Sequence, residues 1–234
     1  MAKPSTSIKP CEMCEDRMAD GLLGRVCHVC QNKVRFATLP PEQQKAEILT
    51  VVPKRFIDAS LKTVALAKEL IKPNYTGMLL WGSVGTGKTF AMAAFAQYLI
   101  SEGFACQRIH YEMLCLRLRD TYSPNATQTE YGLLEPYLNC DALFIEDVGT
   151  TKSIGKKESD FSTKIFYLLL EIRLENMKPT FITSNKSLEN LTKSFDSRIG
   201  DRLRMFKIFK LTGKSKRKYI EMTGDERRKV NLYG

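Results

Sequence analysis

The sequence has no run of apolar residues that approaches the roughly 20 needed to cross a bilayer. Its first residues, MAKPSTSIKP, lack the apolar core of a secretory signal peptide, and the chain contains no internal repeat or low-complexity tract. We therefore expect a soluble protein, not associated with a membrane, that stays in the reducing compartment where it is made. Thiols rarely pair as disulfides there, so metal binding is the better use for clustered cysteines.

The chain is long enough for one full core and a small appendage. It has 234 residues, 43% of them hydrophobic and 26% charged, as is ordinary for a globular protein. Four of its seven cysteines fall in the first 30 residues, and the pair Pro40 and Pro41 interrupts the mixed stretch that follows. We predict a small metal-binding module over residues 1–35, a linker over residues 36–53 and a larger domain over residues 54–234.

The net charge of +10 is concentrated near the end of the chain. Residues 198–229 hold 12 Lys or Arg against 4 Asp or Glu, so this stretch contributes +8 of the total. A basic surface this local suits a polyanion as partner. A solvated helical face followed by a loose basic tail gives the same composition, and both interpretations stay open.

Short apolar runs alternate with helical patterns from residue 54 onward. The runs predicted as strands are Met78–Trp81, Ala105–His110, Ala142–Ile145, Thr180–Thr183 and Phe206–Leu211. The main helical patterns are Thr89–Ser101, Tyr111–Asp120 and Phe161–Asn176. Strands spaced by helices predict an α/β fold with a mostly parallel five-stranded sheet covered on both faces. Ligands of such sheets bind at the carboxyl ends of the strands.

A glycine-rich segment follows the first of these strands. The sequence GSVGTGKT fits G-x-x-x-x-G-K-[ST] and opens an apolar helix, the setting in which such a loop wraps backbone N–H groups around phosphate oxygens. We expect Lys88 to reach the β- and γ-phosphates of ATP and the Thr89 hydroxyl to bind Mg²⁺. The predicted nucleotide-binding residues of this loop are Gly82, Ser83, Val84, Gly85, Thr86, Gly87, Lys88 and Thr89.

Two acids end the predicted strand Ala142–Ile145, as in a Walker B segment, whose acids hold Mg²⁺ and orient the attacking water. Most P-loop ATPases of this type have Asp before Glu, whereas this chain has Glu146 before Asp147. We assign Glu146 to Mg²⁺ and Asp147 to the water, although the reversed order leaves open which of them orients it. The shorter Asp147 predicts slow hydrolysis, because a misplacement of about 1 Å can cost roughly 100-fold.

Asn185 follows the predicted strand Thr180–Thr183 and occupies a sensor-type position. Its side chain there can orient the water or contact the γ-phosphate. Asn also ends strands for purely local reasons, so the residue alone does not decide between the two interpretations.

With these sites in place, the chain from about Val52 onward resembles the DnaC/IstB family, the AAA+ group that contains bacterial and phage replicative helicase loaders and transposition helper ATPases. The resemblance rests on VPKRFIDASL, GSVGTGKT, ALFIEDVG, KPTFITSNKSLENL and SRIGDRLRMF followed by LTGKSKR. It implies an AAA+ P-loop NTPase fold, a truncated lid because few residues follow Arg217, and ATP hydrolysis in the cytoplasm of a bacterial cell, whether the cell or a phage encodes the protein.

The same resemblance assigns roles to several arginines. Arg202, with Arg198 as second choice, matches the arginine finger that reaches a neighbour's nucleotide, which implies self-association in the ATP state. Arg217 matches the sensor 2 arginine, which contacts the nucleotide of its own subunit. The alternative for each arginine is a place on an ordinary basic face.

Family members bind single-stranded DNA partly through an insertion between the second and third strands. Here this stretch is YEMLCLRLRDTY, with Arg117 and Arg119 for phosphates and Tyr122 for stacking on a base. An amphipathic helix that covers the sheet explains the pattern equally well. A further candidate DNA surface in the loop after the acids consists of Lys152, Lys156 and Lys157.

The N-terminal cysteines have the spacing of a metal site. Two C-x-x-C pairs separated by 12 residues can present four thiolates to Zn²⁺, and they consist of Cys11, Cys14, Cys27 and Cys30. His28 lies inside the second pair and is a minority alternative to one thiolate. A structural metal would supply the folding energy that so short a module lacks. We expect the other three cysteines to lie in the core of the larger domain: Cys106, Cys115 and Cys140.

Some helicase loaders carry an N-terminal zinc module that grips the helicase. Residues 1–53 hold 7 Lys or Arg and 6 Asp or Glu, which favours a protein over DNA as the module's target. The resemblance thus favours a replicative helicase loader that binds single-stranded DNA. Two alternatives are a transposition helper that acts on duplex DNA and a regulator that binds DNA through the zinc module.

Overall fold

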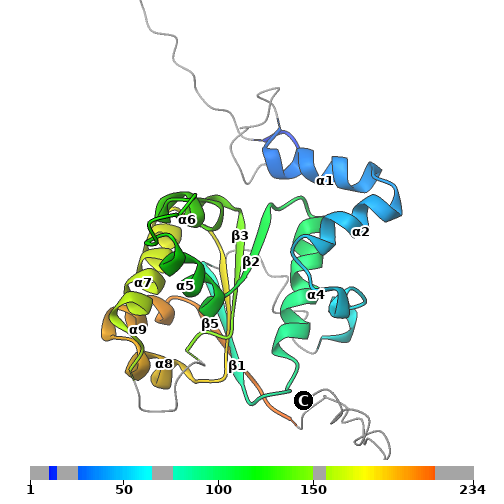
Figure 1. Ribbon diagram of the computed structural model, residues 1–234. Helices are drawn as coiled ribbons and strands as arrows, with labels where there is room; N and C mark the ends of the chain where they lie inside the picture. The colour runs from blue at the N-terminus through cyan, green and yellow to red at the C-terminus, as the bar shows by residue number, and fades with distance from the viewer. Residues whose placement is uncertain (1–10, 15–25, 65–75, 150–156, 214–234) are drawn as a thin grey trace, which may run out of the picture.

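A computed structural model describes residues 11–14, 26–64, 76–149 and 157–213 (Figure 1). No helix within these ranges is long and apolar enough to cross a membrane. Half of the basic C-terminal stretch, residues 214–229, lies outside them, as do three residues with predicted roles: Lys152, Lys156 and Arg217.

The core of the fold is a five-stranded sheet in which every neighbouring pair of strands is parallel. Its strands are β1 (Gly77–Gly82), β2 (Cys106–His110), β3 (Ala142–Glu146), β4 (Thr180–Ser184) and β5 (Lys207–Leu211). Their spatial order is β2-β3-β4-β1-β5, so β2 and β5 are the edge strands. All five predicted strands are confirmed, together with the parallel arrangement.

Helices cover both faces of the sheet. They are α4 (Lys88–Ser101), α5 (Tyr111–Asp120), α6 (Glu130–Asn139), α7 (Asp160–Glu175), α8 (Leu188–Ser194) and α9 (Ser197–Arg204). Helix α4 packs on one face, and α5 to α9 lie on the other (Figure 1). Alternate strand residues therefore enter different cores, because successive side chains of a strand point to opposite faces. Met78 and Leu80 pack with α4, whereas Leu79 packs on the opposite side.

The three cysteines expected in the core are buried there, as predicted: Cys106, Cys115 and Cys140. Burial raises the pKa of each thiol, which keeps it neutral. They therefore act as small apolar side chains.

The described residues 28–63 are mostly helical. Helix α1 (His28–Thr38) and helix α2 (Pro41–Leu49) are followed by the short 3₁₀ turns η1 (Lys54–Phe56) and η2 (Leu61–Thr63). Three apolar residues of this segment, Phe36, Val51 and Val52, are buried in the same cluster as α4. The predicted linker thus packs on the larger domain. Pro41 begins α2 instead of breaking it, because the first helical position needs no N–H donor.

Candidate nucleotide site and metal centre

The loop between β1 and α4 requires glycine at particular positions. Gly85 and Gly87 have φ angles of 83° and 97°, in the left-handed region that other residues rarely adopt. A Cβ atom on Gly82 would lie 2.2 Å from the carbonyl oxygen of Leu211 on the neighbouring strand β5. The glycines therefore fix a tight loop that leads into the N-terminus of α4, where backbone N–H groups favour an anion.

Lys88 lies inside this loop and is only 6% exposed. Its ammonium group donates hydrogen bonds to the carbonyl oxygens of Gly82 at 2.8 Å and Ser83 at 2.9 Å, and to Oδ1 of Asn185 at 2.7 Å. Asn185 follows β4, whose last residue pairs with Trp81 of β1. The structure thus brings together the lysine and the predicted sensor residue.

The remaining residues of the loop lie around this lysine. Thr89, the predicted Mg²⁺ ligand, is half-buried in the first turn of α4, and Thr86 is buried, with its hydroxyl donating to the carbonyl oxygen of Ser83 at 2.9 Å. Val84 is 57% exposed at the tip. The loop therefore exposes Ser83 and Val84 to solvent and buries Thr86 and Lys88.

Glu146, the last residue of β3, is buried and paired with an arginine of β2. Nη2 of Arg108 donates a hydrogen bond of 2.5 Å to Oε2 of Glu146. In the part of the chain that the structure describes, Nε of Arg108 is buried and has no hydrogen-bond partner. The first acid of the pair is therefore already bound to a cationic side chain.

Asp147 has a different environment. Its backbone N–H donates to Oγ1 of Thr183 at 3.0 Å, and its φ angle is 55°, in the left-handed region. Oδ2 of Asp147 lies 3.3 Å from Nε2 of His110, and both side chains are more than one third exposed. Of the two acids, Asp147 is therefore the one more open to solvent.

Arg108 and His110 are the site residues that sequence reasoning missed. We predicted their strand, but the sequence does not show that it lies beside β3. In the structure His110 pairs in register with Glu146. The side chain of Arg108 therefore contacts Glu146, and that of His110 contacts Asp147. These two residues could have been found only if the order of the strands in the sheet had been known.

Arg202, the predicted arginine finger, is bound within its own chain. Its guanidinium donates to the carboxylate of Glu171 and to the hydroxyl of Tyr167, the latter at 2.9 Å, and stacks 4.4 Å from the Tyr167 ring. The hydrogen bond between Arg202 and Glu171 raises the pKa of Arg202 and lowers the pKa of Glu171. The side chain of Arg198 is 62% exposed, compared with 19% for Arg202. To act as an arginine finger, Arg202 would have to break its hydrogen bond to Glu171.

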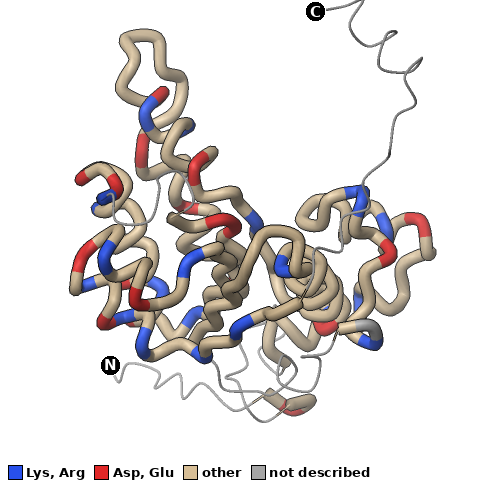
Figure 2. Tube along the Cα trace, turned by 90° about the horizontal axis from the view of Figure 1, so that it is seen from below, with Lys and Arg blue, Asp and Glu red and all other residues tan. Residues whose placement is uncertain are grey.

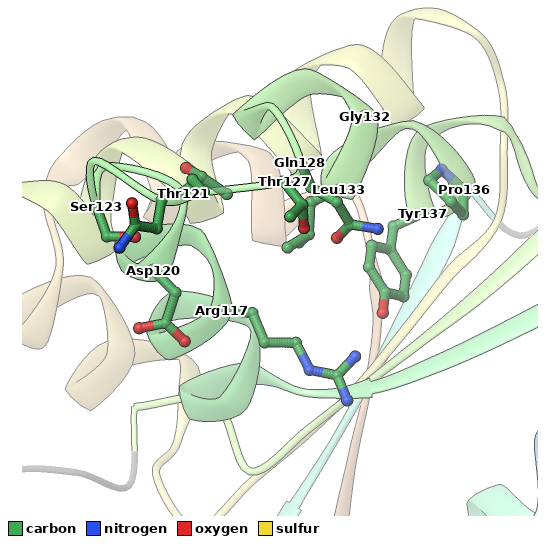
Figure 3. A pocket seen from close by; sticks show the side chains of 12 residues that line it. Arg117, Asp120, Thr121, Ser123, Thr127, Gln128, Gly132, Leu133, Pro136 and Tyr137 are labelled. Atoms are coloured by element: carbon green, nitrogen blue, oxygen red, sulfur yellow. The ribbon is translucent and has the colours of Figure 1, made fainter.

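Of the three predicted DNA-binding side chains, one lines a pocket and two lie against the same aromatic ring. Arg117 extends into a pocket of about 560 Å³ between α5 and α6 (Figure 3). Arg119 lies 5.4 Å from the Phe161 ring, and Tyr122 is 62% exposed and donates to Glu130 at 2.6 Å. The Tyr122 ring lies 6.2 Å from the same Phe161 ring, so Arg119 and Tyr122 are neighbours, and Arg117 lines the separate pocket. Lys and Arg are interspersed with Asp and Glu along the described chain (Figure 2), and Lys157 is exposed.

The four N-terminal cysteines form a compact cluster. All four sulfur atoms lie within 4.8 Å of one another, and Sγ of Cys14 is 3.9 Å from Sγ of Cys27. Tetrahedral zinc with bonds of about 2.3 Å needs sulfur separations of about 3.8 Å, so the cluster fits this ion. Among the described residues it contains cysteines alone, because Nε2 of His28 is bonded to Asp141 at 2.9 Å.

The environment of Cys11 favours a thiolate. Burial opposes ionisation, but the backbone N–H groups of Cys27 and Met13 donate to its sulfur at 3.2 and 3.4 Å and lower its pKa to about 6. Burial, by contrast, raises the pKa of Cys30. The thiolate is the form of cysteine that binds metals, so these N–H groups suit Cys11 to a metal site.

The cysteine cluster is fixed to the end of α4 that lies away from the glycine-rich loop (Figure 1). His28 contacts Asp141, whose other oxygen accepts the N–H of Ala105 at 2.8 Å. Gly103 follows α4 at a φ angle of 88°, and a Cβ there would lie 2.1 Å from the carbonyl oxygen of Val29. The cluster is therefore seated directly on the larger domain.

This contact predicts that metal loading and the stability of the larger domain are linked. Purified protein should carry about one zinc per chain. Cys27→Ser should lose the metal and lower the melting temperature by about 5 °C, because α1 would no longer be held in place on α4. Metal analysis and calorimetry measure the two effects. Cys115→Ala, which removes a buried thiol outside the cluster, should retain the zinc; equal metal content in Cys27→Ser would contradict the assignment.

The sheet order β2-β3-β4-β1-β5, with a glycine-rich loop after β1 and two acids at the end of β3, is that of a P-loop ATPase of the AAA+ class. Residues 53–209 match the family of the bacterial DnaA ATPase domain. Because this match covers more than half of the chain, the protein belongs to that family of DnaA- and DnaC-type AAA+ ATPases. Membership implies that the domain binds and hydrolyses ATP.

Curated relatives are named replicative helicase loader DnaC. The protein of Escherichia coli strain K12 is 27% identical over 132 residues, which are 56% of this chain and 51% of that protein. The protein of Buchnera aphidicola subsp. Schizaphis graminum is 26% identical over 174 residues, 72% of this chain and 68% of its own. This chain therefore spans about half the length of the Escherichia coli relative.

Solved structures share the fold. A DnaC helicase loader is similar with a TM-score of 0.57 and 21% identity, covering 68% of this chain and 100% of that chain. DnaA from Aquifex aeolicus with bound AMPPCP gives a TM-score of 0.57 at 17% identity, covering 66% of this chain and 50% of that one. At these identities the likeness establishes the architecture.

Proposed function

We propose that this protein is an ATP-dependent replicative helicase loader that binds single-stranded DNA and delivers a helicase ring. The observation that carries the proposal is the match of its ATPase domain to proteins named replicative helicase loader DnaC. The glycine-rich loop, the acids after β3 and Asn185 supply the parts that an ATP-driven loader needs. The cysteine module is the candidate docking site for the helicase.

In this proposal the ATP site works as a slow switch. Mg²⁺, when bound, would neutralise phosphate charge, and Thr89 and Glu146 are the residues proposed to hold it. Lys88 binds the β- and γ-phosphates, Asn185 contacts the γ-phosphate, and Asp147 orients the water. Its short side chain slows hydrolysis, so the ATP state persists long enough for subunits to assemble.

Assembly would place an arginine of one subunit at the nucleotide of the next. Arg202 remains the proposed finger, and its release from Glu171 would then accompany assembly. Arg198 lies on the same helix, stacks 4.8 Å from the same tyrosine ring and is the more exposed of the two. The interface would therefore include α9, with Arg217 completing the site from its own subunit.

The docking role of the cysteine module can be tested without unfolding it. Met13 and Val34 are 55% and 50% exposed on the module and on α1. Met13→Asp with Val34→Asp should abolish co-purification with the replicative helicase, because a charge would replace each exposed apolar contact. Zinc content and ATP hydrolysis should stay unchanged. Met177→Asp, at a 71% exposed position after α7, is the matched control and should leave helicase binding intact.

If the double variant still binds the helicase, the cysteine module is not the docking site. Filaments on duplex DNA without any helicase binding would instead indicate a transposition helper. Loss of DNA binding on zinc removal would indicate a regulator that reads DNA through the module. Point variants are needed here, because deleting residues 1–53 would also remove Phe36, Val51 and Val52 from the core.

A further inference from the structure

The pair formed by Arg108 and Glu146 lies where the proposed Mg²⁺ site would be. The two side chains come from neighbouring strands and meet at 2.5 Å, and that of Glu146 is only 5% exposed. A buried carboxylate is unfavourable without a cationic partner, because the low-dielectric interior does not solvate its charge. Arg108 supplies the positive charge that this carboxylate needs.

Mg²⁺ and Arg108 cannot both occupy this position. Arg108 already binds Oε2 of this carboxylate, and two cations a few ångströms apart repel each other strongly in a partly buried site. Binding of the ion to Glu146 therefore requires the guanidinium to withdraw. The contact between Arg108 and Glu146 therefore lowers the affinity for Mg²⁺, however much it stabilises the pair.

Several features allow Arg108 to leave. Its strand, β2, is an edge strand with a neighbour on one side, and its side chain is 26% exposed. Its Nε atom is buried without a hydrogen-bond partner among the described residues, so the present position satisfies the guanidinium only in part. Moving into solvent would hydrate this atom.

We propose that Arg108 holds the place of Mg²⁺ at Glu146 and competes with the ion for the carboxylate. This inference rests on the proposed ATPase function and adds to it a regulation of Mg²⁺ binding. Arg108 keeps the buried acid paired until nucleotide brings its own Mg²⁺, and the displaced guanidinium then lies beside the carboxyl ends of the strands, within the field of the phosphates. The residue is a positioning residue, since it acts through Glu146.

The test measures how Mg²⁺ changes the affinity for a non-hydrolysable ATP analogue. In Arg108→Ala the apparent affinity for Mg²⁺ should rise about tenfold, because the competing cation is gone. Affinity for the analogue without Mg²⁺ should fall or stay the same. A merely structural role would give the opposite sign, since loss of a supporting contact weakens metal binding. Unchanged or weaker Mg²⁺ affinity overturns the proposal.

Two further variants keep the result interpretable. Arg108→Gln removes the charge but can still donate to Glu146, so it should fold and show the same rise even if the alanine variant is unstable. In a Glu146→Gln background, replacing Arg108 should no longer change Mg²⁺ affinity. Arg35→Ala, which removes a 51% exposed arginine of α1, is the control and should leave the affinity unchanged.

This experiment distinguishes failure of the proposed function from failure of the proposed role of Arg108. If the unmodified protein does not bind the ATP analogue at all, the proposed function fails. If it binds the analogue but Arg108→Gln leaves the Mg²⁺ dependence unchanged, only the role of Arg108 fails.

Discussion

Replacing Lys88 with alanine should abolish ATP binding and hydrolysis. The ammonium group is held within the glycine-rich loop by two of its carbonyl oxygens and by Asn185, so it is already positioned where phosphates would arrive. Backbone N–H groups carry only partial charges and cannot replace a full positive charge in a buried site. We expect nucleotide affinity to fall by at least about 100-fold.

Calorimetric titration with ATP and a phosphate-release assay measure this loss. A melting curve shows whether Lys88→Ala folds, because the change leaves two carbonyl groups without their donor. Lys164→Ala removes an exposed lysine of α7 and should bind ATP like the parent. Normal turnover in Lys88→Ala would show that this loop is not the phosphate site.

Local sequence patterns predicted the elements that build this site. The strands and helices were readable because each apolar run is short and bounded by turn residues, and because GSVGTGKT defines both the end of β1 and the start of α4. The two C-x-x-C pairs likewise predicted a cluster whose sulfur atoms meet. In each case the residues that matter are close together in the sequence.

Contacts between distant segments could not be predicted in this way. Arg108 and Glu146 are separated by 38 positions and meet only because β2 lies beside β3. The bond between Arg202 and Glu171 likewise depends on how α9 packs on α7. Pro40 and Pro41 were misleading for another reason. Proline ends a helix but also starts one, and only the burial of Phe36 and Val52 shows that the chain packs there.

The backbone at Asp147 accounts for part of the reversed acid order. Its φ angle of 55° lies in the left-handed region, where Asp and Asn are tolerated better than Glu. A glutamate at this position would reach farther toward a water but would be strained by about 1 kcal/mol. Asp147→Glu should therefore raise the hydrolysis rate with little change in ATP affinity, at some cost in stability.

Asp147→Asn gives the sharper result, because Asn fits the same backbone and nearly the same volume. It should bind ATP within about twofold of the parent yet hydrolyse it at least about 100-fold more slowly, since the amide cannot accept a proton from the water. His110→Asn should have a smaller effect, because His110 lies 3.3 Å from the Asp147 carboxylate and orients it without replacing it. Single-turnover phosphate release, compared with ATP affinity, measures both variants. An Asp147→Asn protein that hydrolyses ATP at the parental rate would mean that Glu146 or Asn185 positions the water.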